Sequence, residues 1–373
     1  MRGKYQYANE RWAGLGPYYA MFPSAFADQV VAKYSSVGDT VLDPFAGRGT
    51  ALFSAVSTER KAIGIEISPV GWIYCKTKLA PAPRDAVAAK IAELGLLSSQ
   101  YEPCAEELPL FFHRCYAPQV RCFLMAARSL LDWRESEVDR TVMAFILVSL
   151  HGKSADSLSN QMRQTKAMSP QYAIDWWESH CSKPPSIEPC EFLTKKLQWR
   201  YRKGTPNVIK SMVALGDSTS ILPQLRGTLR EGGFSRPALM LTSPPYFGIT
   251  NYHYDQWIRL WLLGGPPIDR RTPTQFKGKH QEKFVNVNEY RVLLTSVFSE
   301  AAKIVRRDAV VYVRTDSREP TQSITRSTLQ AAFPRHRFRR VIRPLLGQTQ
   351  TRLFGHASSP TGEIDFILTP QFS

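Results

Sequence analysis

Apolar runs that stop abruptly at an acidic or hydroxyl residue recur along the chain, and they predict buried parallel strands. The strand over residues 40–42 leads to Asp43, residues 61–68 contain Glu66, and ALMLTSPPY carries Ser243 at its end. A strand covered on both faces reads as a continuous apolar run, and a loop begins where the run stops. Because ligands of open α/β sheets bind outside the carboxyl ends of the strands, these strand ends are the first candidate site.

Apolar residues at helical spacing lie between these runs. They predict helices over residues 24–34, from about Thr50, and over NEYRVLLTSVFSEAAKIV. YDQWIRLWLLGG predicts one helix that two glycines end. Residues 86 to about 210 are largely helical in pattern, with a polar and basic loop over 151–171. VALGDS, DAVVYVRT, RFRRVIRPLL and GEIDFILTP predict further strands, so the fold class is α/β with a mainly helical insertion.

The loop after residues 40–42 has the features of a site for a nucleotide-like cofactor. Gly47 and Gly49 let the backbone approach a ligand closely, and backbone N–H groups at the following helix can hold a carboxylate. The glycine pattern of a dinucleotide site is absent, and no Gly-Lys-Ser/Thr follows as in a P-loop. Glu66 ends the neighbouring strand, where an acid can accept hydrogen bonds from both ribose hydroxyls. A cofactor with a methionine-type carboxylate suits this loop better than one with a pyrophosphate.

The string TSPPY is suited to holding a planar amine. The exocyclic amines of cytosine and adenine are poor nucleophiles, since their lone pair is delocalised into the ring. The Ser243 hydroxyl and the Pro244 carbonyl could accept the two protons of such an amine, and consecutive prolines hold these acceptors still. Tyr246 offers a flat face for a base extruded from the duplex. Direct in-line transfer to the amine would then need no covalent enzyme intermediate.

Taken together, DPFAGRGT, GIEISP, VALGDST and TSPPY resemble the motifs of the DNA amino-methyltransferases, and the similarity covers most of the chain. The resemblance implies a Rossmann-like, seven-stranded methyltransferase sheet and S-adenosylmethionine as the cofactor. It also implies that Asp217 contacts the adenine moiety and that the arm GPYYAMFPSAFADQV closes over the methionine end. The cofactor-binding residues expected on this basis are Tyr18, Phe22, Asp43, Pro44, Phe45, Ala46, Gly47, Gly49, Thr50, Glu66, Ile67, Asp217 and Ser218.

The same resemblance suggests the target. Family members with Ser before Pro-Pro-Tyr mostly methylate cytosine N4, and those with Asp or Asn mostly methylate adenine N6. We therefore expect a site-specific enzyme acting on a flipped-out cytosine in duplex DNA, with Ser243, Pro244, Pro245 and Tyr246 as catalytic residues. Many members with this loop place it before the cofactor loop, whereas here it follows. This order leaves the subclass open, and N6-adenine methylation stays an alternative.

The resemblance also suggests how the chain is divided. Residues 1–80 would form the arm and the cofactor-binding half of the core, and 211–373 the catalytic half with a basic loop over 266–288. The insertion over 81–210 is the first candidate for target recognition, and the basic loop TPTQFKGKHQEKF over 272–284 is the second. Residues that could contact DNA are His253, Lys277, Lys279, Arg200 and Arg202.

Charge and cysteine usage narrow the class of partner. The net charge is +16, from 48 Lys and Arg against 32 Asp and Glu, and such a balance favours a polyanionic partner. Double-stranded DNA is the expected partner, with a cognate restriction endonuclease as a further candidate. The six cysteines are scattered without a CxxC pair, so no metal site is expected. No signal peptide or membrane-spanning run is present, which predicts a cytoplasmic protein.

Other functions remain as alternatives. An RNA amine methyltransferase would share the basic character of the chain, and a non-catalytic nucleic-acid-binding module could keep a cofactor fold. Pro103-Cys104 and Pro189-Cys190 resemble the nucleophile of carbon-5 cytosine methyltransferases, but neither follows a predicted buried strand.

Overall fold

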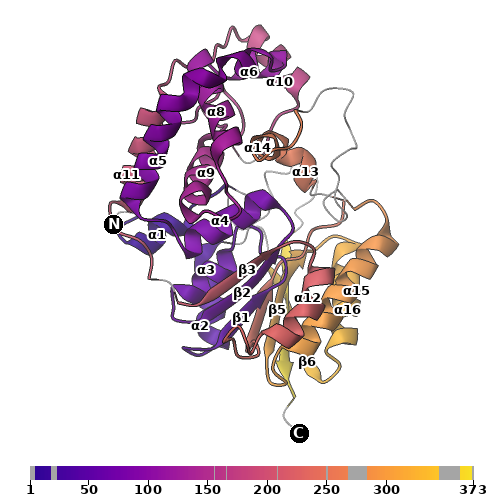
Figure 1. Cartoon of the computed structure of the whole chain (residues 1–373). Coiled ribbons are helices and arrows are strands. Elements are labelled where there is room, and N and C mark those ends of the chain that lie inside the picture. Colours follow the sequence, from indigo (N-terminus) through magenta and orange to yellow (C-terminus); the bar gives the residue numbers. More distant parts are fainter. Residues whose placement is uncertain are drawn as a thin grey trace. The chain divides into compact units, whose positions relative to one another are not determined.

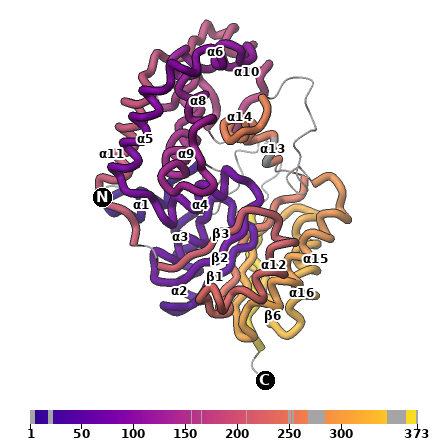
Figure 2. Tube along the Cα trace, in the orientation of Figure 1, coloured from indigo at the N-terminus to yellow at the C-terminus, as the bar shows by residue number. Residues whose placement is uncertain are grey.

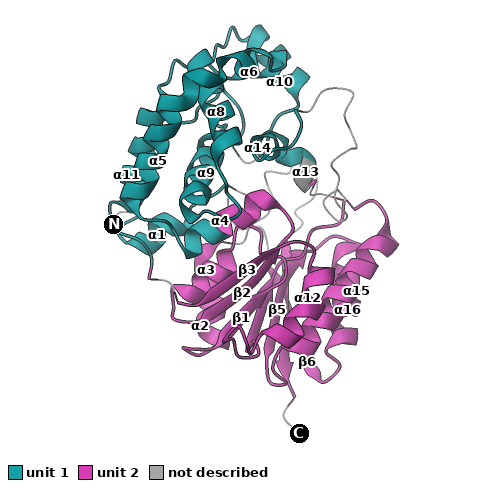
Figure 3. Ribbon diagram, viewed as in Figure 1, with its two compact units in different colours: residues 1–17, 76–206, 252–278 teal, residues 18–75, 207–251, 279–373 magenta. Residues whose placement is uncertain are grey.

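A computed structural model describes most of the chain (Figure 1). The described residues are 5–17, 23–154, 156–164, 166–207, 209–248, 251–267, 284–343 and 362–371. They divide into two compact units, coloured separately in Figure 3. Unit 1 comprises 1–17, 76–206 and 252–278, and unit 2 comprises 18–75, 207–251 and 279–373. Residues 1–17 and 252–278 thus group with the helical unit, whereas the sequence division assigned them to the two halves of the core.

Unit 2 is built on one sheet of seven strands in the order β3-β2-β1-β4-β5-β7-β6. The pairs from β3 to β5 are parallel, and β7 runs antiparallel to both β5 and β6. The chain moves outward from β1 through β2 to β3 and then restarts at β4 on the other side of β1. The expected α/β class with a seven-stranded sheet is confirmed. The strands are β1 Thr40–Asp43, β2 Lys61–Glu66, β3 Ser211–Leu215, β4 Leu239–Thr242, β5 Val310–Asp316, β6 His336–Arg343 and β7 Glu363–Pro370.

Helices cover both faces of this sheet. The helices α12, α15 and α16 lie side by side in Figure 2, and their apolar side chains meet Leu42, Met240 and Val313 in one buried core. The helices α2 and α3 contact each other and the strands β4 and β1. Cover on both faces is why the central strands β1 and β4 are buried at every position. The helices of this unit are α2 Ser24–Tyr34, α3 Thr50–Val56, α4 Pro69–Leu79, which continues into unit 1, α12 Ser218–Thr228, α15 Val287–Ile304 and α16 Thr321–Ala332.

The regular elements among the described residues of unit 1 are all helices, apart from one isolated bridge between Gly152 and Gln161. The longer helices bury apolar faces, as in α9, where almost every residue from Asp139 onward is buried. The bounds are α1 Ala8–Ala13, α5 Arg84–Leu97, η1 Ser98–Tyr101, α6 Glu102–Glu106, α7 Leu110–Cys115, α8 Pro118–Leu130, α9 Glu137–Ser149, α10 Pro170–Ser179, α11 Pro189–Tyr201, α13 Tyr252–Asp255 and α14 Trp257–Leu262.

Two elements differ from the sequence pattern. YDQWIRLWLLGG forms two short helices, α13 and α14, because Gln256 between them leaves the helical conformation. The helix α16 was not expected, since its Thr- and Ser-rich sequence has low helix propensity and gains its stability from packing on the sheet. None of the helices in the described ranges combines the length and the apolar character that crossing a membrane requires.

Candidate active site

The two loops singled out in the sequence begin at adjacent strand ends in unit 2. β1 ends at Asp43 and β4 at Thr242, and the Thr242 hydroxyl donates a hydrogen bond of 2.6 Å to Asp43 Oδ1. The strand order reverses between these two strands. In an open α/β sheet, the crevice outside the carboxyl ends at such a reversal is where ligands bind. The structure therefore brings Asp43 next to the residue that precedes Ser243.

Asp43 is a buried carboxyl group at this point, with a side chain only 2% exposed. Burial raises its pKa to about 7, although hydrogen bonds from Thr242 and from the Phe45 amide act in the opposite direction. A group with this pKa changes charge near neutral pH. A cationic ligand beside it would stabilise the ionised form.

Glu66 closes the cofactor loop from the neighbouring strand. Its Oε2 accepts a hydrogen bond of 2.6 Å from the Gly47 amide, and its Oε1 accepts one of 2.9 Å from the Ser68 amide. The two oxygens are thus fixed in a plane and suited to a pair of neighbouring hydroxyls.

Close packing behind this carboxylate depends on glycine. A Cβ at Gly71 of α4 would lie 2.6 Å from the Gly47 carbonyl oxygen and 2.9 Å from Glu66 Cγ. Gly49 has a φ of +75°, and a Cβ there would meet the Cys75 sulfur at 2.8 Å. Glycine is therefore required at both positions, because a Cβ at Gly71 would push the loop away from Glu66 and one at Gly49 would push it away from Cys75.

The end of β3 joins the same edge. The Gly216 amide donates to the Glu66 carbonyl at 2.9 Å, and the Ser218 hydroxyl donates to the Pro44 carbonyl. Asp217 is the N-cap of α12, and its Oδ1 accepts from the Thr219 amide at 2.8 Å. Capping by itself accounts for an Asp at this position. The contact of Asp217 with an adenine moiety stays a prediction.

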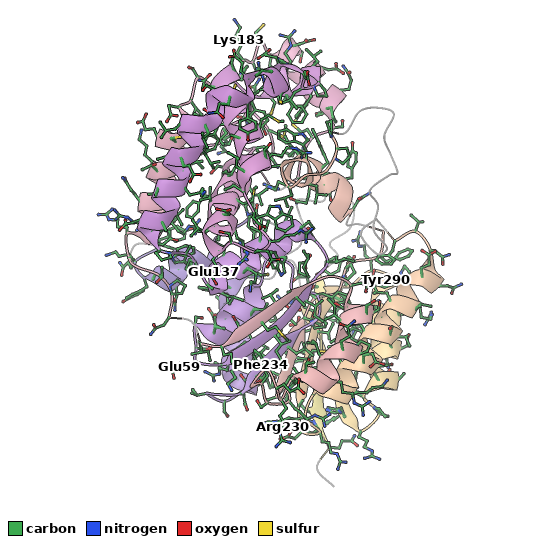
Figure 4. All side chains as sticks on the ribbon, in the orientation of Figure 1. Glu59, Glu137, Lys183, Arg230, Phe234 and Tyr290 are labelled. Atoms are coloured by element: carbon green, nitrogen blue, oxygen red, sulfur yellow. The ribbon has the colours of Figure 1, made fainter. Side chains whose placement is uncertain are left out.

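The Ser-Pro-Pro-Tyr loop is held from two sides. The Ser243 hydroxyl lies 3.5 Å from the Tyr246 hydroxyl, and the hydroxyl of Tyr290 donates to the Pro245 carbonyl at 2.9 Å. Tyr290 belongs to α15 and is labelled in Figure 4. Tyr246 is 4% exposed, and burial, with the nearby charge of Glu363, raises the pKa of its phenol far above the ordinary value. Its ring would become accessible to a base only after neighbouring side chains move.

The remaining cofactor-loop residues lie at this edge as well. Ala46 is buried and its amide donates to the Ile65 carbonyl, which joins the loop to β2. Phe45 packs against the apolar core of unit 2, and Thr50 begins α3. Ile67 is half-buried directly after β2. The roles assigned to these residues in cofactor binding stay predictions.

Several residues expected in the cofactor or DNA site are not among the described residues. Tyr18, Phe22, Lys277 and Lys279 are outside the described residues, and so is the side chain of His253, whose backbone forms part of α13. They stay predictions.

Two expected DNA contacts lie at the end of α11 in unit 1. Arg200 is buried, donates to the Arg11 carbonyl and packs against the rings of Trp12 and Trp199. These contacts give Arg200 a structural role. Its contact with a DNA phosphate stays a prediction. Arg202 is exposed.

Three residues of the site had no place in the sequence prediction. Thr242 belongs to the TSPPY string, and its position directly before Ser243 was the available signal. Ser68 contributes its backbone amide, and Tyr290 lies on the helix α15, far from the loop in sequence. No local sequence pattern indicates either residue. Cys104 lies in α6 and Cys190 in α11, so neither follows a strand of the sheet.

An open α/β sheet with a glycine-rich loop and an acid at adjacent strand ends defines a class of nucleotide-cofactor proteins. Within that class, residues 3–71 match the family model described as DNA methylase, so this segment is similar to the DNA amino-methyltransferases. Similar curated proteins are two from Methanocaldococcus jannaschii and one from Bacillus amyloliquefaciens. Type II methyltransferase M.MjaI is 44% identical over 77 residues, which are 21% of this chain and 23% of the relative. Type II methyltransferase M.MjaII is 33% identical over 66 residues, 18% of this chain and 12% of the relative.

Orphan methyltransferase M.BamHII is 45% identical over 49 residues, which are 13% of this chain and 18% of the relative. The matches thus span less than a quarter of these curated relatives. Among solved structures, the rRNA methyltransferase aviRa from Streptomyces viridochromogenes is 12% identical with a TM-score of 0.34, covering 98% of this chain and 96% of that chain. TrmN from Thermus thermophilus is 11% identical with a TM-score of 0.34, covering 97% of this chain and 52% of that chain. Scores this low support no conclusion about this chain.

Proposed function

We propose that this chain is a DNA methyltransferase that transfers a methyl group from S-adenosylmethionine to the exocyclic N4 amine of a cytosine flipped out of duplex DNA. The observation that carries the proposal is the hydrogen bond between Thr242 and Asp43, which joins the start of the Ser-Pro-Pro-Tyr loop to the start of the glycine-rich loop. A methyl donor and an acceptor amine must meet at bonding distance. Two loops that leave adjacent strand ends are suited to hold one reactant each.

The residues at the carboxyl edge fit the proposed cofactor. Backbone amides hold both carboxylate oxygens of Glu66 in place, and a carboxylate fixed in this way suits the two hydroxyls of a ribose. Gly47 and Gly49 have positive φ values and leave the backbone bare, so a methionine moiety can approach it closely. The buried carboxyl of Asp43 suits a cationic group. When bound, S-adenosylmethionine would supply a methyl group on a positively charged sulfur.

The chain's own part in the reaction is to hold the amine. The Ser243 hydroxyl and the Pro244 carbonyl would accept its two protons and turn its lone pair out of conjugation. Pro244 and Pro245 fix two successive φ angles, and Tyr290 anchors the loop at the Pro245 carbonyl. Such positioning lowers the entropic part of the barrier.

Mass spectrometry of nucleosides from DNA methylated by the purified protein tests the proposed target. We expect N4-methylcytosine, because Ser243 stands where the resemblance associates Ser with cytosine. N6-methyladenine would instead establish the alternative on the same scaffold. Labelled-methyl transfer to tRNA with none to duplex DNA would establish an RNA enzyme, and failure to bind S-adenosylmethionine in a calorimeter would contradict the proposal as a whole.

Substitution of Tyr246 distinguishes the base-binding part of the proposed site from the cofactor-binding part. We expect Tyr246→Ala to lower the rate of methyl transfer at least about 100-fold while the Kd for S-adenosylmethionine changes less than about threefold, since the residue belongs to the base side alone. Tyr246→Phe keeps the ring and serves as the matched control, with most activity retained. Equal loss of cofactor binding and methyl transfer in Tyr246→Ala would contradict the assignment. The cognate restriction endonuclease stays a prediction.

A further inference from the structure

The connection between α9 and α10 in unit 1 is a long irregular segment whose described residues are held by buried polar side chains. The segment runs from Leu150 to Ser169 and has no helix among its described residues. Connections of this length without regular structure are uncommon in compact domains and usually carry function. What holds this one in place can be traced residue by residue.

Asn160 is the first anchor, and its side chain is completely buried. Its Nδ2 donates to the Arg114 carbonyl at 3.2 Å and to the Ser182 carbonyl at 3.1 Å. Its Oδ1 accepts from the Gln161 amide at 2.8 Å and from the Ser182 hydroxyl at 2.6 Å. One amide group therefore ties the middle of the segment to the end of α7 and to the chain that follows α10.

Arg259 of α14 is the second anchor, and it is also completely buried. Its Nε donates to the Leu147 carbonyl at 3.0 Å, and its Nη2 donates to the Gln164 carbonyl at 2.7 Å. His151 adds a bond of 2.7 Å between its Nδ1 and the Arg163 carbonyl. Because burial and the charge of Arg259 hold the pKa of His151 well below its ordinary value, this imidazole is neutral and donates. Residues 163 and 164 are thus fixed from both sides.

Two tryptophans complete the support. Trp177 donates through Nε1 to the Gln161 carbonyl at 2.7 Å, and Trp257 donates to the Met168 carbonyl at 2.9 Å. A buried polar network of this kind adds little stability over an apolar core of equal volume. Its physical effect is to select one backbone conformation, which is what a recognition surface requires.

The side chains that this support presents to solvent are Lys153, Asp156, Arg163 and Gln164. Within the described part of the chain, none of these four side chains has a hydrogen bond or an ion pair. They include both donors and acceptors. Arg pairs with guanine, Gln with adenine, and Asp accepts from the cytosine amine in the major groove, whereas phosphate contact alone would favour cations only. These four side chains are therefore suited to hydrogen bonding with base edges.

We propose that this segment is a pre-ordered DNA-reading loop, and that Arg163 and Gln164 determine part of the target sequence. The inference rests on the proposed function, because a recognition loop has meaning only for an enzyme that methylates DNA at specific sites. It narrows the expected target-recognition region from residues 81–210 to this one connection.

Methylation mapping tests the loop directly. Genomic DNA from hosts that express the wild type, Arg163→Ala or Gln164→Ala would be sequenced with a modification-sensitive method. We expect a defined motif for the wild type, and for at least one variant a motif relaxed at one position. On duplexes that carry the motif or a single substitution in it, discrimination at that position should fall about 10- to 100-fold.

Arg84→Ala is the matched control, since Arg84 is an exposed arginine in the same unit and pairs with the exposed Asp85. Its motif should equal that of the wild type. Unchanged motifs in both loop variants would overturn the inference while leaving the proposed function intact. A wild-type enzyme that leaves DNA unmethylated would overturn both. The loop variants lose no side-chain hydrogen bond or ion pair within the described residues, so they should unfold at the same urea concentration as the wild type.

Discussion

At the scale of single residues, the candidate site depends on two buried carboxyl groups with different surroundings. Glu66 receives two backbone amide donors, whereas Asp43 has a pKa raised to about 7, mainly by burial. In an unfolded chain, Asp ionises near pH 4. The folded protein therefore binds more protons than the unfolded one between about pH 4 and pH 7, and Asp43 makes the fold less stable as pH rises through this range.

Asp43→Asn removes this pH dependence. We compare the free energy of unfolding of the variant with that of the wild type at each pH. The difference, variant minus wild type, should be about 2 to 3 kcal/mol larger at pH 8 than at pH 5, because only the wild type must ionise a buried group over that interval. Urea unfolding at the two pH values measures the difference. Asp85→Asn alters a highly exposed side chain and should show no such difference. An equal effect of Asp43→Asn at both pH values would contradict the raised pKa.

The variant Gly71→Ala tests whether close packing behind Glu66 is required for cofactor binding. Gly71→Ala places a Cβ within 2.6 Å of the Gly47 carbonyl, so the loop and the carboxylate must separate. We expect the affinity for S-adenosylmethionine to fall about tenfold or more in calorimetry. Gly227→Ala in α12 meets no atom within 4 Å and should leave the affinity unchanged, with a gain of about 0.5 to 1 kcal/mol in stability. Unchanged affinity in Gly71→Ala would refute the role of this packing.

At the scale of elements, an ionic cluster joins β5 to β7, the antiparallel pair of the sheet. Arg314 lies opposite Asp365, and its Nε donates to Asp365 Oδ1 at 2.7 Å. The Tyr312 hydroxyl and Arg343 donate to the other carboxylate oxygen, at 2.7 and 2.9 Å. Burial alone would raise the pKa of Asp365, but these donors and the Arg314 charge hold it below its usual range. The guanidinium of Arg314 also lies over the ring of Phe26 in α2, 3.4 Å from its centre.

Removing the cation from this cluster should destabilise unit 2. Arg314→Met leaves the fully buried Asp365 carboxylate without its main partner, and we expect a loss of about 3 to 5 kcal/mol in urea unfolding. The loss should diminish below about pH 4, because a protonated Asp365 no longer needs a cation. Arg84→Met breaks an exposed pair and should cost less than about 1 kcal/mol. A similar small cost for Arg314→Met would show that the cluster contributes little.

At the scale of the whole molecule, the net charge of +16 dominates long-range interactions. A duplex that exchanges condensed counterions for Lys and Arg side chains binds with an affinity that falls linearly with salt on logarithmic axes. This electrostatic term is independent of sequence, so it is separable from readout by the loop that carries Arg163 and Gln164.

Fluorescence anisotropy with a labelled duplex measures the electrostatic term. If six to ten phosphates are neutralised, the affinity should fall by roughly 10³ to 10⁵ between 50 and 200 mM salt. Arg163→Ala should leave the slope unchanged if its contact is to a base, since a lost phosphate contact would lower the slope by about one unit. Binding that does not respond to salt would contradict a polyanionic partner.

The local pattern of hydrophobic and polar residues was sufficient to predict the strands, the loops and most of the helices. Continuous apolar runs identified β1, β2, β4, β5 and β7, because strands buried on both faces are mostly apolar. The pattern failed where packing overrides propensity, as in α16, and where one apolar run divides at Gln256 into two helices. It also gave no sign of Tyr290 or of the buried bonds of Asn160, since these partners lie far apart in the sequence.

The sequence by itself determined the fold class, the two loops and the residue types that suit a methyl donor and an amine, because each depends on neighbours within a few positions. Only the tertiary structure decided that Thr242 bonds to Asp43, that amides of two segments hold Glu66, and that one irregular connection presents Arg163 and Gln164 on a fixed backbone. Contacts between distant segments depend on strand order and on side chains that meet in the core, and neither is written in any local stretch of the chain.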